Sequence, residues 1–211
     1  GFTGPTGFTG SVGPTGTFGP TGLCWSDYLY WNNVSNSWQP DSKNIHIGCD
    51  AGKVDQKGLA VAIGYQAGQF TQATGSVSIG PHAGATGQQQ SSIAIGEAAG
   101  GFSQNRQAVA IGYRAGGINQ KAGAIAIGGY FQYDTITGLF NPSFLTGYDN
   151  QGERSIAIGS SAGNSNQGDF NIAIGYSAGK TNQAPNQNGI AIGYSAGQSN
   201  QGSGAIAIGA S

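Results

Sequence analysis

The Asp and Glu residues are the first candidates for catalysis in this chain. A site that cleaves glycans, for example, needs two carboxylates close together. Of the nine Asp and Glu residues, only Asp134, Asp149 and Glu153 gather around one irregular segment where they could meet. Charged residues near loops are usually just solvated, so we predict no catalytic residues.

The two histidines and two cysteines offer little further chemistry. His46 and His82 occupy different positions of the repeat described below, so they do not form a metal-ligand spacing. We expect no metal and no cofactor. Cys24 and Cys49 are candidates for a disulfide within or between chains, and two free thiols are an equally good interpretation.

The composition indicates a fibrous protein rather than an ordinary globular enzyme. Glycine accounts for 40 of the 211 residues, only 8% are charged, and the net charge is -1. There is no basic cluster to favour nucleic acid and no apolar run long enough to span a membrane, so we expect neither as a partner. The chain begins in one repeat and stops in another, which predicts that it is part of a longer protein.

One short motif, Ile-Ala-Ile-Gly, organises most of the chain and is clearest at residues 93–96. It occurs in ten copies, spaced by 16 residues except for one step of 31 and one of 18. Repetition at a fixed short period indicates a solenoid, in which each coil stacks on the one before. The final glycines of the copies are Gly48, Gly64, Gly80, Gly96, Gly112, Gly128, Gly159, Gly175, Gly193 and Gly209.

The positions within the motif alternate between branched and small residues. Ile precedes every final glycine, Ile or Val stands two positions earlier, and the residue between them is Ala in eight copies, with Ser78 and His46 as exceptions. This alternation predicts a strand. We expect the Ile and Val side chains to be buried inside the roll and the small residues to face a close neighbour. The glycine would end the strand where a Cβ atom would obstruct that neighbour or a turn.

Two further positions recur in most copies. An Ala-Gly pair such as Ala99-Gly100 follows the motif, and a Gln such as Gln104 stands eight residues before the next final glycine. In the ninth copy an insertion of two residues moves Asn182-Gln183 out of this spacing. Side-chain amides repeated from coil to coil predict a hydrogen-bonded ladder.

Sixteen residues give about 53 Å of extended chain, enough for two short strands and two turns. The sequence therefore predicts a flattened, two-sided roll. A three-sided helix with a hexapeptide period does not fit a period of 16, and the Gly-Gly-x-Gly-x-Asp repeat of calcium-binding rolls is absent.

The extended repeat, (Ser/Ala)-Ile-Ala-Ile-Gly-Tyr-x-Ala-Gly, resembles the head repeats of trimeric autotransporter adhesins. The resemblance covers residues 45–211 apart from one insert. It implies a left-handed parallel β-roll in which three chains lie side by side, and an extracellular, non-catalytic, adhesive role. The coiled-coil stalk and membrane anchor of that family are not seen in this sequence.

Residues 1–24 have a second architecture, because glycine occupies every third position from Gly1 to Gly22. A strict Gly-X-Y period predicts a collagen triple helix, with a flexible linker as the lesser alternative. The segment resembles collagen-like surface proteins of bacteria, phages and giant DNA viruses. The fold class we predict is therefore all-β: a trimeric left-handed parallel β-roll, or β-solenoid, preceded by a collagen-like triple helix, on a virion or cell surface. The alternative function is a β-solenoid enzyme that degrades polysaccharide on a tail or surface fibre.

Residues 25–44 join the two architectures and are rich in aromatics. The segment from Tyr28 to Trp38, with Asn32-Asn33 between two aromatic runs, predicts a hairpin. We favour a role as a cap over the first coil, since solenoids need capped ends. An aromatic platform for sugar is the alternative.

Residues 129–150 lengthen one repeat step and predict a protruding hairpin around Thr137-Gly138. Insertions in solenoids often carry the binding face, whereas packing over the roll as a brace is an equally strong alternative. If the insert binds, its partner is a host-surface glycan or protein receptor. The predicted binding residues are Tyr130, Phe131, Tyr133, Phe140 and Phe144.

Overall fold

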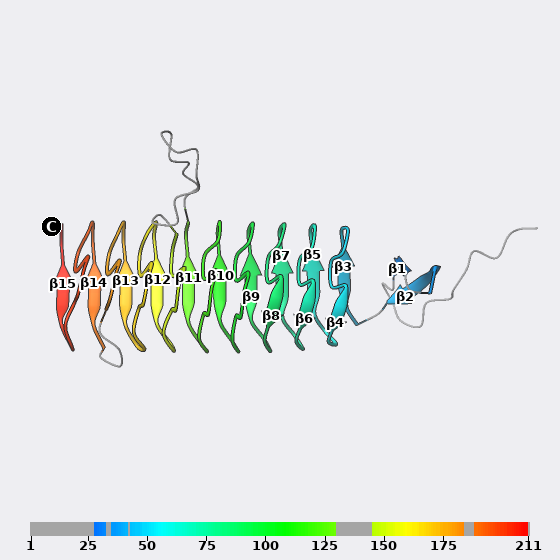
Figure 1. Cartoon of the computed structure of the whole chain (residues 1–211), viewed down its shortest axis with the longest axis horizontal. Helices are drawn as coiled ribbons and strands as arrows, with labels where there is room; N and C mark the ends of the chain where they lie inside the picture. The colour runs from blue at the N-terminus through cyan, green and yellow to red at the C-terminus, as the bar shows by residue number, and fades with distance from the viewer. Residues whose placement is uncertain (1–27, 33–34, 42, 130–144, 184–187, 211) are drawn as a thin grey trace, which may run out of the picture. The chain divides into compact units, whose positions relative to one another are not determined.

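The computed structural model describes a chain made of strands and turns (Figure 1). It divides into two compact units, Gly1–Ser42 and Lys43–Ser211, which are described separately. No helix occurs among the described residues. The predicted collagen-like segment, residues 1–24, lies outside them. The described residues are 28–32, 35–41, 43–129, 145–183 and 188–210.

The first unit contains the predicted hairpin. Strands β1 (Tyr28–Asn32) and β2 (Ser37–Asp41) pair antiparallel, with Trp31 opposite Trp38. Asn36 has a positive φ of 51° in the turn, a conformation that Asn adopts more readily than most residues.

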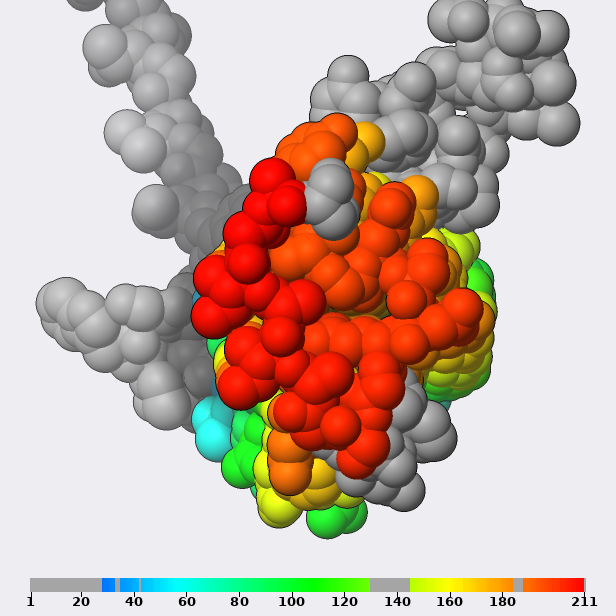
Figure 2. Space-filling model, turned by 90° about the vertical axis from the view of Figure 1, so that its left-hand side faces the viewer, coloured from blue at the N-terminus to red at the C-terminus, as the bar shows by residue number. Residues whose placement is uncertain are grey.

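The second unit is a parallel β-solenoid, and its larger sheet has ten strands, one from each copy of the motif. Each strand pairs with the same positions of the next coil, so Ile95 lies beside Ile111. Figure 2 looks onto the C-terminal coil, with earlier coils behind it. The strands are β3 (Ile45–Ile47), β5 (Val61–Ile63), β7 (Val77–Ile79), β9 (Ile93–Ile95), β10 (Val109–Ile111), β11 (Ile125–Ile127), β12 (Ile156–Ile158), β13 (Ile172–Ile174), β14 (Ile190–Ile192) and β15 (Ile206–Ile208).

A second, smaller sheet forms the other side of the first three coils. It has three strands, β4 (Val54–Gln56), β6 (Phe70–Gln72) and β8 (Thr86–Gln88). Isolated parallel bridges continue its line from Thr86 to Ser199. The prediction of a two-sided roll with two extended segments and two turns per coil is confirmed.

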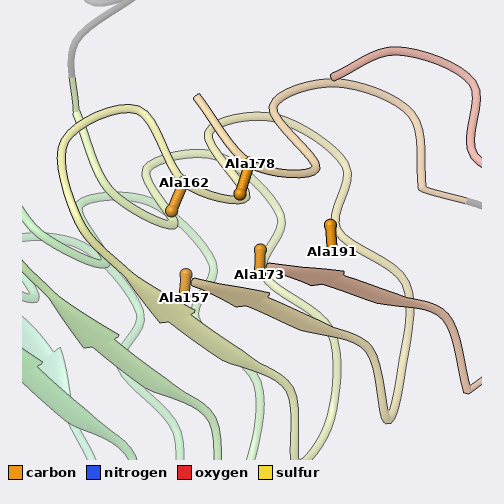
Figure 3. Packing of buried hydrophobic residues seen from close by; sticks show 5 residues of the cluster. All are labelled: Ala157, Ala162, Ala173, Ala178 and Ala191. Carbon is orange, nitrogen blue, oxygen red and sulfur yellow. The ribbon is translucent and has the colours of Figure 1, made fainter. Parts of the chain in front are cut away.

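The core of the roll corrects one prediction, because the alanines and not the branched residues point inward. Ala94 and Ala110 are fully buried and cluster with Ala83 and Ala99 from the Ala-Gly pairs. Figure 3 shows the same arrangement further along, where Ala157, Ala173 and Ala191 of successive strands point toward Ala162 and Ala178. The two sides of the coil lie too close together for Ile to fit between them. An added Cβ atom at Gly100 would lie only 3.3 Å from the Cβ of Ala94.

The final glycine of every motif but the last is required by the stacking of coils. Gly96 has a φ of +119°, and a Cβ atom there would lie 2.8 Å from the carbonyl oxygen of Gly112 in the next coil. No other residue tolerates both the dihedral angle and the contact. The prediction that glycine stands where a Cβ atom would obstruct a neighbour is confirmed.

Buried glutamines fill much of the remaining interior, and several of them are hydrogen-bonded from coil to coil as the predicted ladder. Gln104 is fully buried, and its Nε2 donates to the carbonyl of Ile93 at 2.7 Å and to Oε1 of Gln120 at 3.2 Å. Gln183 stays on the ladder and donates to Gln201 at 2.8 Å, despite the longer step in this copy. The extra residues therefore follow Gln183 and leave the amide row in register.

Candidate functional site

The branched residues of the large sheet form one outward surface, here called the Ile/Val face. They are the first and third residues of every strand, and alternation along a strand places them opposite the buried alanine. All twenty are half-buried or exposed in this chain. The residues are Ile45, Ile47, Val61, Ile63, Val77, Ile79, Ile93, Ile95, Val109, Ile111, Ile125, Ile127, Ile156, Ile158, Ile172, Ile174, Ile190, Ile192, Ile206 and Ile208.

The Ile/Val face is long, flat and uninterrupted by charge. Ten strands spaced about 4.8 Å apart extend for about 43 Å along the solenoid. Ile206 and Ile208 of the last strand are 67% and 73% exposed. Soluble monomers rarely present a continuous apolar surface of this size, and such surfaces mark contacts with another protein or a membrane.

The smaller sheet carries a second outer row whose character changes along the chain. Apart from Thr86, its first members are apolar, and Phe70 and Phe102 are 43% and 59% exposed. Its later members are polar: Asp149, Ser165, Thr181 and Ser199. Sequence analysis missed this row, although its signal was present: a residue six positions after the final glycine in each regular copy.

An exposed asparagine ladder runs beside the polar part of that row. The Nδ2 of Asn150 donates to Oδ1 of Asn166 at 3.2 Å, and Asn166 donates in turn to Asn182 at 3.3 Å. Each of these residues has a positive φ near 53°, which Asn tolerates well. The amide ladder predicted for the later copies is therefore present both inside and outside the coil.

The five predicted binding aromatics, Tyr130, Phe131, Tyr133, Phe140 and Phe144, lie outside the described residues. The chain re-enters the coil at Leu145 and Thr146, both fully buried. Tyr148 lies against Gly117, where an added Cβ atom would be 2.6 Å from its ring. Residues 145–151 thus rebuild a normal coil immediately after the insert.

Of the three carboxylates weighed as catalytic candidates, Asp149 and Glu153 lie within the described residues. Asp134 lies outside them, and Glu153 has Arg154 at 3.7 Å. Partial burial acts to raise the pKa of Asp169. Hydrogen bonds from the Glu153 N–H and the Lys121 ammonium, together with the positive charge of Lys121, outweigh this effect and hold the pKa below its usual value. Lys121 Nζ lies 3.1 Å from the carboxylate.

His46 and His82 lie in different coils of the roll. His46 is half-buried at the inward position of β3. His82 is exposed and contacts Tyr65 edge-on, with the two ring centroids 5.3 Å apart. Cys49 is exposed, and Cys24, the other member of the candidate disulfide, lies outside the described residues. Within the described part of the chain, no three His, Cys, Asp or Glu side chains could hold a metal ion.

Comparison with known proteins gives no match to any family model, curated protein or solved structure. The described residues include no helix of the length and hydrophobicity that a membrane span requires.

Proposed function

We propose that this chain is a subunit of a trimeric extracellular fibre that mediates attachment from a virion or cell surface. Three collagen-like segments form the shaft, and three left-handed rolls form the head with their Ile/Val faces turned toward a common axis. The observation that carries this proposal is the Ile/Val face itself.

The face supports assembly because the roll does not need it for its own core. Alanines and glutamines already fill the interior of each coil, and Ala94 and Gln104 are fully buried without help from Ile95. A sheet face exposed to water normally carries polar residues. Burying half-exposed Ile and Val side chains against another copy contributes about 25 cal/mol per Å² of apolar surface, repeated over ten coils.

The proposed trimeric state rests on the N-terminal Gly-X-Y segment. A Gly-X-Y repeat is stable only as three chains wound together, since only glycine fits at their axis. Residues 1–24 keep this period without a break. Chains joined in threes there bring three rolls side by side, in the same direction, and in reach of one another.

Attachment is assigned to the insert. A regular solenoid presents the same pattern of residues on every coil, which gives stiffness but little specificity. The segment holding Tyr130, Phe131, Tyr133, Phe140 and Phe144 departs from the repeat and concentrates aromatics, which favour protein and glycan contacts. Its partner in this proposal is a host-surface glycan or protein receptor.

Assembly is tested by placing a charge on the Ile/Val face. Ile95→Asp or Ile174→Asp should convert the full chain from trimer to smaller species, measured by light scattering. Ser165→Asp is the matched control, because Asp149 occupies the equivalent outer position in the preceding coil. A trimer of unchanged mass and melting temperature for Ile95→Asp would overturn the assignment.

Attachment is tested by deleting residues 129–143, which restores the regular step of 16. The intact and shortened trimers would be compared for binding to a glycan array and to immobilised extracellular-matrix proteins. We expect the shortened trimer to form and to lose binding. Equal binding by both forms would contradict the assignment of the insert.

A further inference from the structure

The hairpin of the first unit has two unlike faces. Cross-strand partners share a face, so Leu29 and Pro40 lie on the same side as Trp31 and Trp38. The two indoles meet edge-on with ring centroids 5.6 Å apart. They are nevertheless 46% and 52% exposed. We call this apolar side, Leu29, Trp31, Trp38 and Pro40, the Trp face.

The opposite face is polar and satisfies its own hydrogen bonds. Gln39 Oε1 accepts from Tyr30 Oη at 3.2 Å and from Asn32 Nδ2 at 3.0 Å. Gln39 Nε2 in turn donates to Ser35 Oγ at 3.1 Å. This face is suited to water, so the two sides of the hairpin need different surroundings.

A two-stranded hairpin by itself has only marginal stability in water, and it needs another element packed on its apolar side. Two half-exposed indoles on one face are the largest uncovered aromatic surface in the described part of this unit. The Trp face therefore calls for a partner that is itself apolar.

We propose that the Trp faces of three copies pack against one another and that this hairpin cluster sets the register of the fibre. The inference rests on the trimer proposed above and assigns the residues that align its chains. It makes residues 28–41 an assembly element, rather than only a cap on the first coil.

Chain connectivity favours a second copy as the occupant. Only four peptide steps separate the end of the collagen-like segment at residue 24 from Tyr28, a reach of at most about 14 Å. Three chains wound together at residue 24 hold three hairpins at high effective concentration. The partner surface that is always within reach is the Trp face of a sister chain.

Register is a real problem for this chain because both flanking segments are periodic. A Gly-X-Y segment that slips by one triplet still places glycine at the axis, and an Ile/Val face that slips by one coil still meets Ile and Val. The hairpin occurs once in the described chain and has one set of contacts. A cluster of three hairpins therefore admits a single alignment, from which shaft and head can both propagate.

A sugar on the Trp face is the competing occupant, and the geometry disfavours it. Sugar sites combine a ring face with polar groups that orient hydroxyls. Here the polar side chains lie on the other side of the hairpin, and the indoles are inclined at 73° rather than forming one flat platform.

The contact is tested in the full chain with a photo-crosslinking phenylalanine analogue at position 38, on the Trp face. The same analogue at position 30, on the polar face, is the control. Irradiation should give covalent dimers and trimers from position 38 and none from position 30. A trimer by light scattering without crosslinks at position 38 would overturn this inference and leave the trimer intact, whereas a monomeric chain would overturn the trimer itself.

The register role is tested with Trp31→Ser/Trp38→Ser, refolded from heat and followed by circular dichroism. Refolding should slow by tenfold or more and yield trimers with several melting transitions. Ser37→Ala, on the polar face, should refold as the wild type does. Wild-type refolding with a single transition in the double variant would overturn the register role.

Discussion

Ala94 and Ile95 are adjacent residues of β9 that lie on opposite sides of one sheet. Ala94 is fully buried among the alanines of the coil, and Ile95 is only half-buried on the outside. Small residues and amides therefore fill the interior of the roll. Its most hydrophobic side chains lie on the outside, where another chain can contact them.

The narrow interior predicts that larger residues are not tolerated there. Ala94→Val should destabilise the roll by about 1–3 kcal/mol, because overpacked cores force backbone shifts. Thermal melting of the purified chain measures this. Phe102→Thr is the matched control, since Thr86 holds the equivalent outer position one coil earlier. A wild-type melting temperature for Ala94→Val would show that the interior has room.

The stacked glycines predict a sharp contrast between two Gly→Ala substitutions. At Gly96 the new Cβ atom would lie 2.8 Å from Gly112 O, with φ at +119°, and a strained backbone costs about 1–3 kcal/mol or more. At Gly202 nothing lies within 4 Å of the added atom, so Gly202→Ala should be neutral or slightly stabilising. Equal urea midpoints for the two variants would contradict the account.

The inner amide ladder should contribute much more than the outer one. Gln104→Leu removes the donor to Oε1 of the buried Gln120 and an acceptor of Gln88 Nε2, and an unsatisfied buried group costs about 1–3 kcal/mol. Asn166→Ser should cost under about 0.5 kcal/mol, because surface changes are usually small and Ser103 holds the equivalent position earlier. Denaturant unfolding compares the two, and a larger loss for Asn166→Ser would reverse our ranking.

The lowered pKa of Asp169 predicts that the roll loses a small part of its stability at acidic pH. Its lowered pKa means that the folded state favours the carboxylate, so its contribution is present above the ordinary Asp pKa of about 3.9 and is lost as pH falls below that value. Asp169→Asn should be less stable than wild type at pH 7, by at most about 1 kcal/mol since Lys121 is exposed. Melting at pH 7 and pH 3 should show the difference shrinking on acidification. A constant difference would exclude this ion pair as its cause.

Much of the fold could be predicted from the sequence because each coil repeats the same requirements. The spacing of residues 93–96 identified the strands, Gly96 the close stacking, and Gln104 the ladder. Alternation shows only that a strand has two unlike faces, so it could not tell that Ile95 points outward. The direction of Ile95 depends on the width of the coil. The space opposite Gly100 accommodates the methyl group of Ala94 and no larger side chain.

The irregular positions were harder to predict. The longer step after Gln183 could not be placed within its coil from spacing alone, whereas the structure keeps Gln183 on the ladder. The change from Phe102 to Ser165 along the outer row also went unnoticed, because that position varies in type and only its spacing is constant.

The central claim is that three copies assemble through the Ile/Val face, and sedimentation equilibrium of the full chain tests it most directly. We predict a single species with three times the chain mass of 21.2 kDa, across the accessible concentration range. A stable, soluble species of 21.2 kDa with the circular dichroism of the folded roll would contradict the claim, because the Ile/Val face would then be stable in water without a partner.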